Sequence, residues 1–321
     1  MPGLQAQEIV RIALRIAKAP NYTQDANSLL NAILAELCQE QDFDAAKQAF
    51  NFTFSGATTP IGNLNAQLAS GPFKLPVDYL RAKFGDVLYF PNGLANFPLK
   101  LTPIDLAEFD ALVQQAGFQN FPVYWATDMS AASPMLTTTG NTHGTTTLDT
   151  LTATTNLGAS GGVAGPGIVP GTTFTYAGGN SVTLSKAALS TVTGGSFTFG
   201  TPPIAYVWPP AGGAYPALVR YYSQMPDIVT PSASNQVPWF PNTQFLITEL
   251  AGRVMQITGD DRWESFLSDN ENAHPGGSRV LLRRYLQMKD DNSNRAKRVR
   301  LDPRRFGPAW SSLPKSKVFG Y

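Results

Sequence analysis

The sequence predicts an α+β fold in which helices from both chain ends form a bundle and β-strands lie between them. Three observations support this. Apolar residues recur at helical spacing near both ends, and short alternating stretches bounded by Gly, Pro or Asn fill the middle. The last 30 residues carry no helical stripe. With 321 residues, 43% of them hydrophobic, the chain can bury the core of one large domain or two ordinary ones.

Two helices are expected within residues 1–50, as the first part of the bundle. Pro20 ends the first, because proline cannot continue a helix. Thr23 or Asp25 can cap the second. Its broad apolar stripe consists of Leu29, Leu30, Ile33, Leu34 and Leu37 and continues toward Phe43 and Phe50. These stripes predict a helical hairpin that is buried against other helices.

A discontinuous β-rich domain is expected at 51–128 and 204–242. In its first part, strands are predicted at 73–83, 87–90 and 121–126. Thr102 is predicted to cap a short helix that has Pro103 in its first turn. In the second part, the apolar stretches 204–208 and 218–222 flank a Gly-rich turn, and this pattern predicts a β-hairpin.

Residues 129–203 differ sharply from their surroundings. Asp149 and Lys186 are the only charged residues, and the 65 residues from Met135 to Phe199 include 18 Thr and 12 Gly. Alternating stretches such as Thr172 to Tyr176 favour a small β-sandwich or barrel inserted between strands of the parent domain. Low-complexity disorder is the alternative.

The second part of the bundle is expected at 243–291. Asn242 or Thr243 can cap a helix that ends at Gly259. Its apolar stripe consists of Leu246, Leu250, Val254 and Ile257. A last helix is predicted from Asp261, with a break near 274–277 and a new start before Val280.

The net charge of +1 is unevenly distributed. Residues 279–321 hold 12 Lys/Arg and 3 Asp/Glu, a net of +9, whereas residues 1–278 hold 12 and 20, a net of −8. A basic tail is expected to seek an acidic partner, and an acidic body to avoid adhering to DNA.

Residues 292–321 are predicted to form an extended basic arm. Fully stretched, these 30 residues span roughly 100 Å. The candidate binding residues are Arg295, Lys297, Arg298, Arg300, Arg304, Arg305, Phe306, Trp310, Phe319 and Tyr321. A segment so basic, aromatic and rich in proline folds only on a partner. The aromatic residues and prolines favour a groove in a partner protein, and a DNA phosphate track is the alternative.

No catalytic, cofactor or metal site is predicted. The glycine-rich stretch 158–162 lacks the lysine and the helix of a phosphate loop. His143 and His274 lie 131 positions apart and are interpreted as loop residues, and Cys38 as a small core residue. Paired aspartates at 260–261 and 290–291 lie beside helix ends, where negative charge is common. The protein is therefore not expected to be an enzyme.

A single cysteine excludes an internal disulfide. The N-terminus lacks an apolar run of signal-peptide length, and no stretch reaches the 18 apolar residues of a membrane span. We therefore expect the protein to fold in a cytosol and to have no membrane partner.

The succession of segments resembles the head-to-tail adaptor (connector) family of short-tailed bacteriophages. It is carried by 8–16 (EIVRIALRI), 30–37 (LNAILAEL), 41–46 (QDFDAA), 75–81 (LPVDYLR), 206–210 (YVWPP) and 217–226 (ALVRYYSQMP). The inserted segment resembles a Thr/Gly-rich β-module of phage virion proteins, through 165–173 (GPGIVPGTT) and 181–185 (SVTLS).

The resemblance implies a structural protein at the head-tail junction of a virion, assembled in the host cytoplasm. Adaptors of this family form a homo-oligomeric ring, usually twelve-fold, beneath the portal protein. Their arms contact the portal, their β-parts contact tail nozzle or fibre proteins, and DNA passes through the channel without specific binding. Three alternatives stay open: a nozzle or fibre-anchoring protein, a virion-associated peptidoglycan hydrolase, and a nucleic-acid-binding protein.

Overall fold

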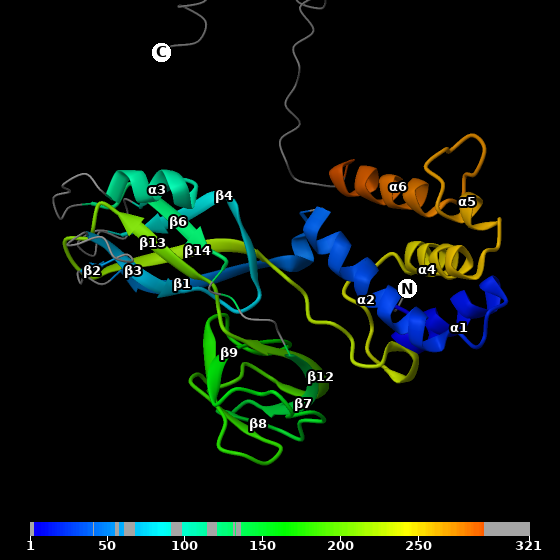
Figure 1. Ribbon diagram of the computed structural model, residues 1–321, viewed down its shortest axis with the longest axis horizontal. Coiled ribbons are helices and arrows are strands. Elements are labelled where there is room, and N and C mark those ends of the chain that lie inside the picture. Colours follow the sequence, from blue (N-terminus) through cyan, green and yellow to red (C-terminus); the bar gives the residue numbers. More distant parts are fainter. Residues whose placement is uncertain are drawn as a thin grey trace, which may run out of the picture.

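The computed structural model describes residues 3–40, 42–54, 58–60, 68–90, 98–113, 121–130, 132 and 136–291. It contains both helices and β-sheets, which confirms the α+β class. Figure 1 shows most helices on one side of the molecule, the larger sheet on the other, and a small barrel beside both. Each of these three parts has its own hydrophobic core.

The helical region combines both ends of the described chain. It consists of α1 (Ala6–Ala17), α2 (Thr23–Glu40), α4 (Thr243–Thr258), α5 (Trp263–Phe266) and α6 (Ser278–Asp291). Helices α1, α2 and α4 bury their apolar faces in one core, and α6 packs against this core through Leu281, Leu282 and Tyr285. Burial of these stripes is what holds the helices together, because short helices are marginal alone.

The ends of α4 lie where the sequence predicts them. The Asn242 side chain accepts a hydrogen bond from the Phe245 N–H at 3.1 Å, and Gly259 ends the helix with a left-handed φ of 73°. Leu246, Leu250 and Val254 are fully buried, as predicted, but Ile257 is 52% exposed. The prediction is wrong for Ile257, because the helical core ends at Met255.

The apolar stripe of α2 is buried from Leu30 to Leu37, and the helix ends at Glu40. The predicted continuation of this stripe is wrong. Phe43 packs in the helical core but precedes a short 3-10 helix, η1 (Asp44–Ala46), whereas Phe50 lies in a strand and belongs to the core of the sheet. Residues 47–50, expected in the bundle, are therefore part of the sheet.

The larger sheet has eight strands among the described residues, in the order β1-β14-β4-β5-β6-β13-β3-β2. They are β1 (Lys47–Phe54), β2 (Thr58–Pro60), β3 (Leu68–Lys74), β4 (Tyr79–Tyr89), β5 (Leu99–Pro103), β6 (Tyr124–Asp128), β13 (Ile204–Trp208) and β14 (Tyr215–Ser223). The pairs are antiparallel except β5 with β6. The first strand of the order, β1, touches the second-last, β3, because the Phe52 and Phe73 ring centroids lie 5.6 Å apart, so the sheet curls toward closure.

The predicted hairpin between β13 and β14 is wrong. Strand β13 pairs with β3 and β6, and β14 pairs with β1 and β4, so three strands separate them in the sheet. The Gly-rich residues between β13 and β14 allow the chain to turn, but a turn does not require the two strands that flank it to pair with each other. The partner of a strand is decided by which distant surfaces its side chains bury, and Val219 and Tyr221 are fully buried between β1 and β4.

The predicted short helix begins later than expected. Thr102 and Pro103 belong to strand β5, because the Thr102 N–H donates to the Val123 carbonyl at 2.8 Å. Helix α3 (Leu106–Val113) starts after Asp105, whose backbone carbonyl accepts the Phe109 N–H at 2.9 Å. Phe109 and Val113 then bury against Ala126 of β6, which places α3 on one face of the sheet (Figure 1).

Residues 136–200 form a closed barrel. Of the two folds expected for this inserted segment, a β-sandwich or a barrel, the structure therefore shows the barrel. Its strands, in the order β10-β11-β8-β7-β12-β9, are β7 (Leu136–His143), β8 (Thr147–Asp149), β9 (Ser160–Ala164), β10 (Thr172–Thr175), β11 (Val182–Leu184) and β12 (Thr191–Gly200). Alternate residues such as Phe174, Val182 and Phe197 fill the interior. The barrel lies in the chain between β6 and β13, which are neighbours in the larger sheet.

Glycine allows the barrel to pack closely against the sheet. A Cβ atom on Gly171 would lie 2.1 Å from the Phe50 ring, and one on Gly162 would lie 2.9 Å from Val77. Lys186 covers the same Phe50 ring at 5.7 Å from its centroid. The barrel is thus seated on strand β1 rather than linked only by its two connections.

Candidate functional site

The predicted portal-binding arm lies outside the described residues, and so do all ten of its candidate binding residues. The described part of the basic C-terminal segment is α6. Arg279, Arg283 and Arg284 are exposed on this helix, and Arg284 pairs with Glu271 at 2.7 Å. The Tyr285 ring lies 5.2 Å from the Phe240 ring, which fixes the helix on the core.

Beneath α6, one arginine joins α2 to α4. The Arg253 guanidinium binds both carboxylate oxygens of Glu36, at 2.8 and 2.5 Å, and its Nε donates to Glu249 at 2.8 Å. Glu249 is only 5% exposed, so its charge depends on this partner. Hydrogen bonding to Arg253 lowers the pKa of Glu36, and the two carboxylates raise the pKa of Arg253. The network sets how α2 and α4 lie under α6.

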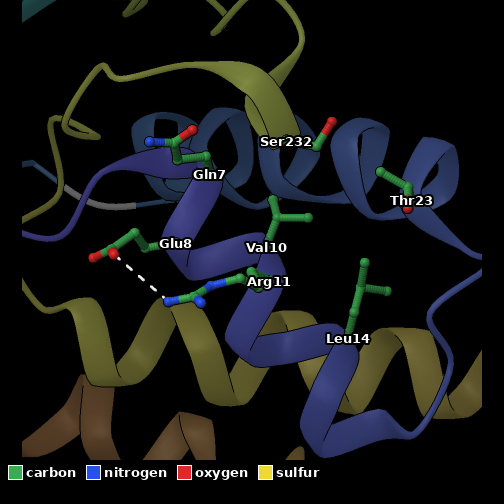
Figure 2. Close-up of a pocket in the computed structure, with 7 residues that line it drawn as sticks. All are labelled: Gln7, Glu8, Val10, Arg11, Leu14, Thr23 and Ser232. Atoms are coloured by element: carbon green, nitrogen blue, oxygen red, sulfur yellow. Dashed lines mark ion pairs between the residues drawn. The ribbon is translucent and has the colours of Figure 1, made fainter.

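A surface cavity of about 470 Å³ lies along α1 (Figure 2). Gln7, Glu8 and Arg11 project from α1, while Thr23 and Ser232 come from α2 and from η3 (Pro231–Ala233). Glu8 and Arg11 form an exposed ion pair at 3.6 Å, which is worth little in water. The cavity therefore presents a mixed polar surface and no concentrated charge.

The segment 224–242 links the sheet to α4 and is held by two asparagines of α2. Asn31 donates to the Ile228 carbonyl and accepts from its N–H, both at 3.0 Å. Asn27 accepts from the Ser232 N–H at 2.7 Å and donates to its hydroxyl at 3.0 Å. These two side-chain amides thus provide hydrogen-bond partners for polar groups of segment 224–242, whose backbone is not paired in a sheet.

Gln236 ties the same segment to the barrel and to the N-terminus. Its amide nitrogen donates to the Gly194 carbonyl at 2.7 Å, and its amide oxygen accepts from the Ser196 hydroxyl at 3.0 Å. Its backbone carbonyl accepts from the Ala6 N–H at 2.8 Å. Segment 224–242 is therefore the place where the helical region, the sheet and the barrel meet.

A half-buried carboxyl lies where this segment leaves the sheet. The Tyr221 hydroxyl donates to Asp78 at 3.1 Å, and the Asp78 carbonyl accepts from the Gln224 N–H at 2.7 Å. Burial raises the pKa of Asp78 to about 6. Its described side-chain partner, Tyr221, has a pKa that is itself raised by burial and by the neighbouring Asp78.

The other candidate residues of the sequence are placed as follows. His143 is not a loop residue but ends strand β7, where its Nε2 lies 3.1 Å from the Asp149 carboxylate. Sequence spacing missed this pair because the two residues meet across the β7–β8 turn. Cys38 is buried in α2, as predicted, and burial raises the pKa of its thiol. Asp260 pairs with Arg262 just beyond α4.

Among the residues that the structure describes, no group of three or more His, Cys, Asp or Glu side chains could hold a metal ion. No helix within the described ranges is long and apolar enough to cross a membrane. No protein-family model matches the chain, and no curated protein matches it.

Proposed function

We propose that this chain is a structural adaptor of a phage virion that joins the portal ring to the tail. In this proposal, helices from both chain ends form its bundle, a discontinuous β-domain carries the inserted barrel, and residues 292–321 form an extended arm. The observation that carries the proposal is the charge distribution, with a net of +9 on residues 279–321 and −8 on the rest.

The position of α6 supports this proposal. The basic segment begins on α6, which packs on the helical core through Leu281, Leu282 and Tyr285, and its exposed side carries three arginines. An extended arm that starts from this helix would reach a partner at a distance while its base stays in place. Opposite charge on the partner would accelerate and orient this association.

The division into three cores also supports a connecting role. The helical region, the sheet and the barrel each bury their own apolar residues and expose separate surfaces. Segment 224–242 joins the three through side-chain amides of Asn27, Asn31 and Gln236. A protein that must contact several partners at once benefits from such separate, fixed surfaces. An acidic body beside passing DNA would repel phosphates and let the DNA slide.

Sedimentation with the portal ring from the same phage tests the proposal. Full-length protein and a version that ends at Asp291 are each mixed with the ring, and co-sedimentation is measured. We expect only the full-length protein to bind, with an affinity that falls as salt concentration rises. A variant with Arg11→Gln and Arg15→Gln is the matched control, because it removes two exposed cations of α1 and leaves the arm intact.

Equal binding by the full-length and shortened proteins would show that the arm is not the portal anchor. Binding by neither, with binding to a nozzle or fibre protein, would overturn the adaptor role in favour of another tail component. Salt-sensitive binding to DNA that is lost with the arm would instead favour the nucleic-acid alternative.

A further inference from the structure

Two adjoining cavities lie between the barrel and segment 224–242. The first, the apolar cavity, has a volume of about 300 Å³ and is lined by Pro166, Val192, Met225, Pro238 and Trp239 among others. The second, the hydroxyl cavity, has a volume of about 690 Å³ and is lined by Thr139, Thr152, Thr193, Thr230, Ser234 and Asn235 among others. Both share Thr193, Gly194 and Gln236, so they form one groove at a boundary between regions, a common place for ligand sites.

The lining of this groove is free of charge. None of the residues that line either cavity is acidic or basic, in contrast with the cavity along α1, which contains Glu8 and Arg11. A phosphate, a nucleic acid or a charged peptide would leave its counter-charge in solvent on entering such a site, at a cost in desolvation. The lining therefore favours a neutral ligand.

Several polar groups of the groove have unused hydrogen-bonding capacity. Among the described residues, the hydroxyls of Thr193 and Thr230 and the amide nitrogen of Asn235 make no hydrogen bond. Gln236 behaves differently, because its amide nitrogen donates to Gly194 and its amide oxygen accepts from Ser196, both in β12. On one side of the groove, Gln236 is held in place by β12. The remaining polar groups can hydrogen-bond with a ligand, and a hydroxyl can act as a donor or as an acceptor.

The backbone of the hydroxyl cavity is held in an uncommon conformation. Thr230 has a φ of 47°, in the left-handed region that a β-branched residue rarely adopts. Gly194, which lines both cavities, has a φ of 64°. Glycine adopts this conformation without strain, but Thr230 does not, and strained residues gather at ligand sites, where the surrounding structure holds them. Segment 224–242 presents the Thr230 hydroxyl in this conformation through the neighbouring contacts of Asn27 and Asn31.

The apolar cavity offers a surface of rings. Trp239 is half-buried, and it lines the cavity together with Pro166, Pro226 and Pro238. An indole combines a large apolar face with one polar group, which suits a ligand that itself has apolar faces and hydroxyl edges.

We propose that this groove binds a neutral oligosaccharide. Its hydroxyl groups would hydrogen-bond with Thr193, Thr230 and Asn235, and the apolar face of a sugar ring would pack beside Trp239. This activity goes beyond the adaptor role and does not rest on it, because the groove involves neither the arm nor α6.

Isothermal titration and saturation-transfer NMR with full-length protein test this inference. The probes are maltohexaose, cellohexaose, mannohexaose and N-acetylchitohexaose, together with an uncharged proline-rich peptide. We expect at least one saccharide to bind saturably, and the peptide not to bind. Thr193→Trp would place a large ring where the two cavities meet and is expected to weaken binding by roughly tenfold or more. Thr175→Trp is the matched control, because Thr175 is exposed on the barrel and lines neither cavity.

A second variant separates a binding role from a structural one. Thr230→Gly removes a free hydroxyl and relieves the left-handed backbone, so binding should weaken severalfold while the thermal midpoint does not fall. Absence of binding by all four saccharides would overturn the inference, and so would binding by the peptide alone. Equal loss of binding in Thr193→Trp and Thr175→Trp would also overturn it, because the binding would then not be in this groove.

Discussion

The barrel and the helical region bury different kinds of polar groups. In the barrel the buried polar side chains are hydroxyls, namely Thr138, Thr142, Thr172, Ser196 and Thr198. Thr142, for example, donates to the Ser190 carbonyl at 2.9 Å and accepts from the Val192 N–H at 3.1 Å. The helical region also buries one hydroxyl, that of Ser278, but of the two regions it alone buries a carboxylate among the described residues, namely Glu249, which Arg253 neutralises.

Because of this difference, salt and pH should affect the stability of the two regions differently. Hydrogen bonds between neutral groups are nearly independent of salt and of pH between the usual pKa ranges. A buried ion pair depends on both partners staying charged, and its loss leaves a desolvated charge. The buried polar groups of the barrel should thus be insensitive to salt and pH. The helical region should lose stability in acid as Glu36 becomes protonated, because hydrogen bonding to Arg253 lowers the pKa of Glu36 in the folded state.

The largest expected effects come from the two cores themselves. Phe197→Ala in the barrel and Leu250→Ala in α4 each remove a fully buried side chain, and each should destabilise its own region by about 3–5 kcal/mol. Hydrogen exchange followed by mass spectrometry should show faster exchange in 136–200 for the first variant and in the helices for the second. Loss of protection in both regions for either variant would contradict the independence of the two cores.

Next in size is the removal of the cation in the helical region. Arg253→Met leaves Glu249 buried without its partner and should lower the free energy of unfolding by about 2–4 kcal/mol, measured by urea denaturation at pH 7. Arg262→Met is the matched control, because its ion pair with Asp260 is exposed and should leave the midpoint unchanged. If both variants lose the same stability, the buried charge is not what makes Arg253 important.

A smaller effect is expected where the barrel meets the sheet. In Gly171→Ala, the new Cβ would lie 2.1 Å from the Phe50 ring, so the variant should be about 1–3 kcal/mol less stable than Gly179→Ala. Both glycines have a left-handed φ, 71° and 81°, but Gly179 has nothing within 4 Å, so the difference isolates the clash. Thermal denaturation measures it, and equal midpoints would show that the barrel is not tightly seated on β1.

The smallest effect concerns pH. The pKa of Asp78 is raised to about 6 by burial, so its protonated form favours the folded state. Its contribution is therefore fully present below pH 4 and is lost as pH rises through about 6. Asp78→Asn should remove this dependence and gain about 1–2 kcal/mol over the native protein at pH 7.

Denaturation at pH 4, 5, 6 and 7 checks this prediction. Asp149→Asn in the barrel is the matched control, because its carboxylate is exposed and bound to His143, with a pKa lowered from its usual value. A difference between Asp78→Asn and native protein that stays constant across this range would show that the Asp78 carboxyl does not titrate there.

Patterns within one element could be predicted from the sequence. The cap at Asn242, the end at Gly259 and the buried stripe from Leu30 to Leu37 all follow from rules that act over a few residues. The alternation around Phe174 and Phe197 likewise predicted a folded β-module rather than disorder. The predicted arm lies outside the described residues and stays a prediction.

Contacts between distant elements could not be predicted in the same way. The candidate groove escaped sequence reasoning because Thr193, Thr230 and Trp239 are ordinary residues in two separate stretches, β12 and segment 224–242, and become a site only when the barrel is seated. The strained φ of Thr230 is a property of the fold and has no signal in composition.

The sequence by itself determined the helical and strand periods, the charge asymmetry and the uncharged nature of the inserted module, because each is set by residues close together in the chain. Only the tertiary structure decided that β13 and β14 do not pair, that Phe43 and Phe50 enter different cores, and that His143 meets Asp149. The physical reason is that partners across a fold are selected by the burial of complementary surfaces, and that selection is made by the whole chain at once.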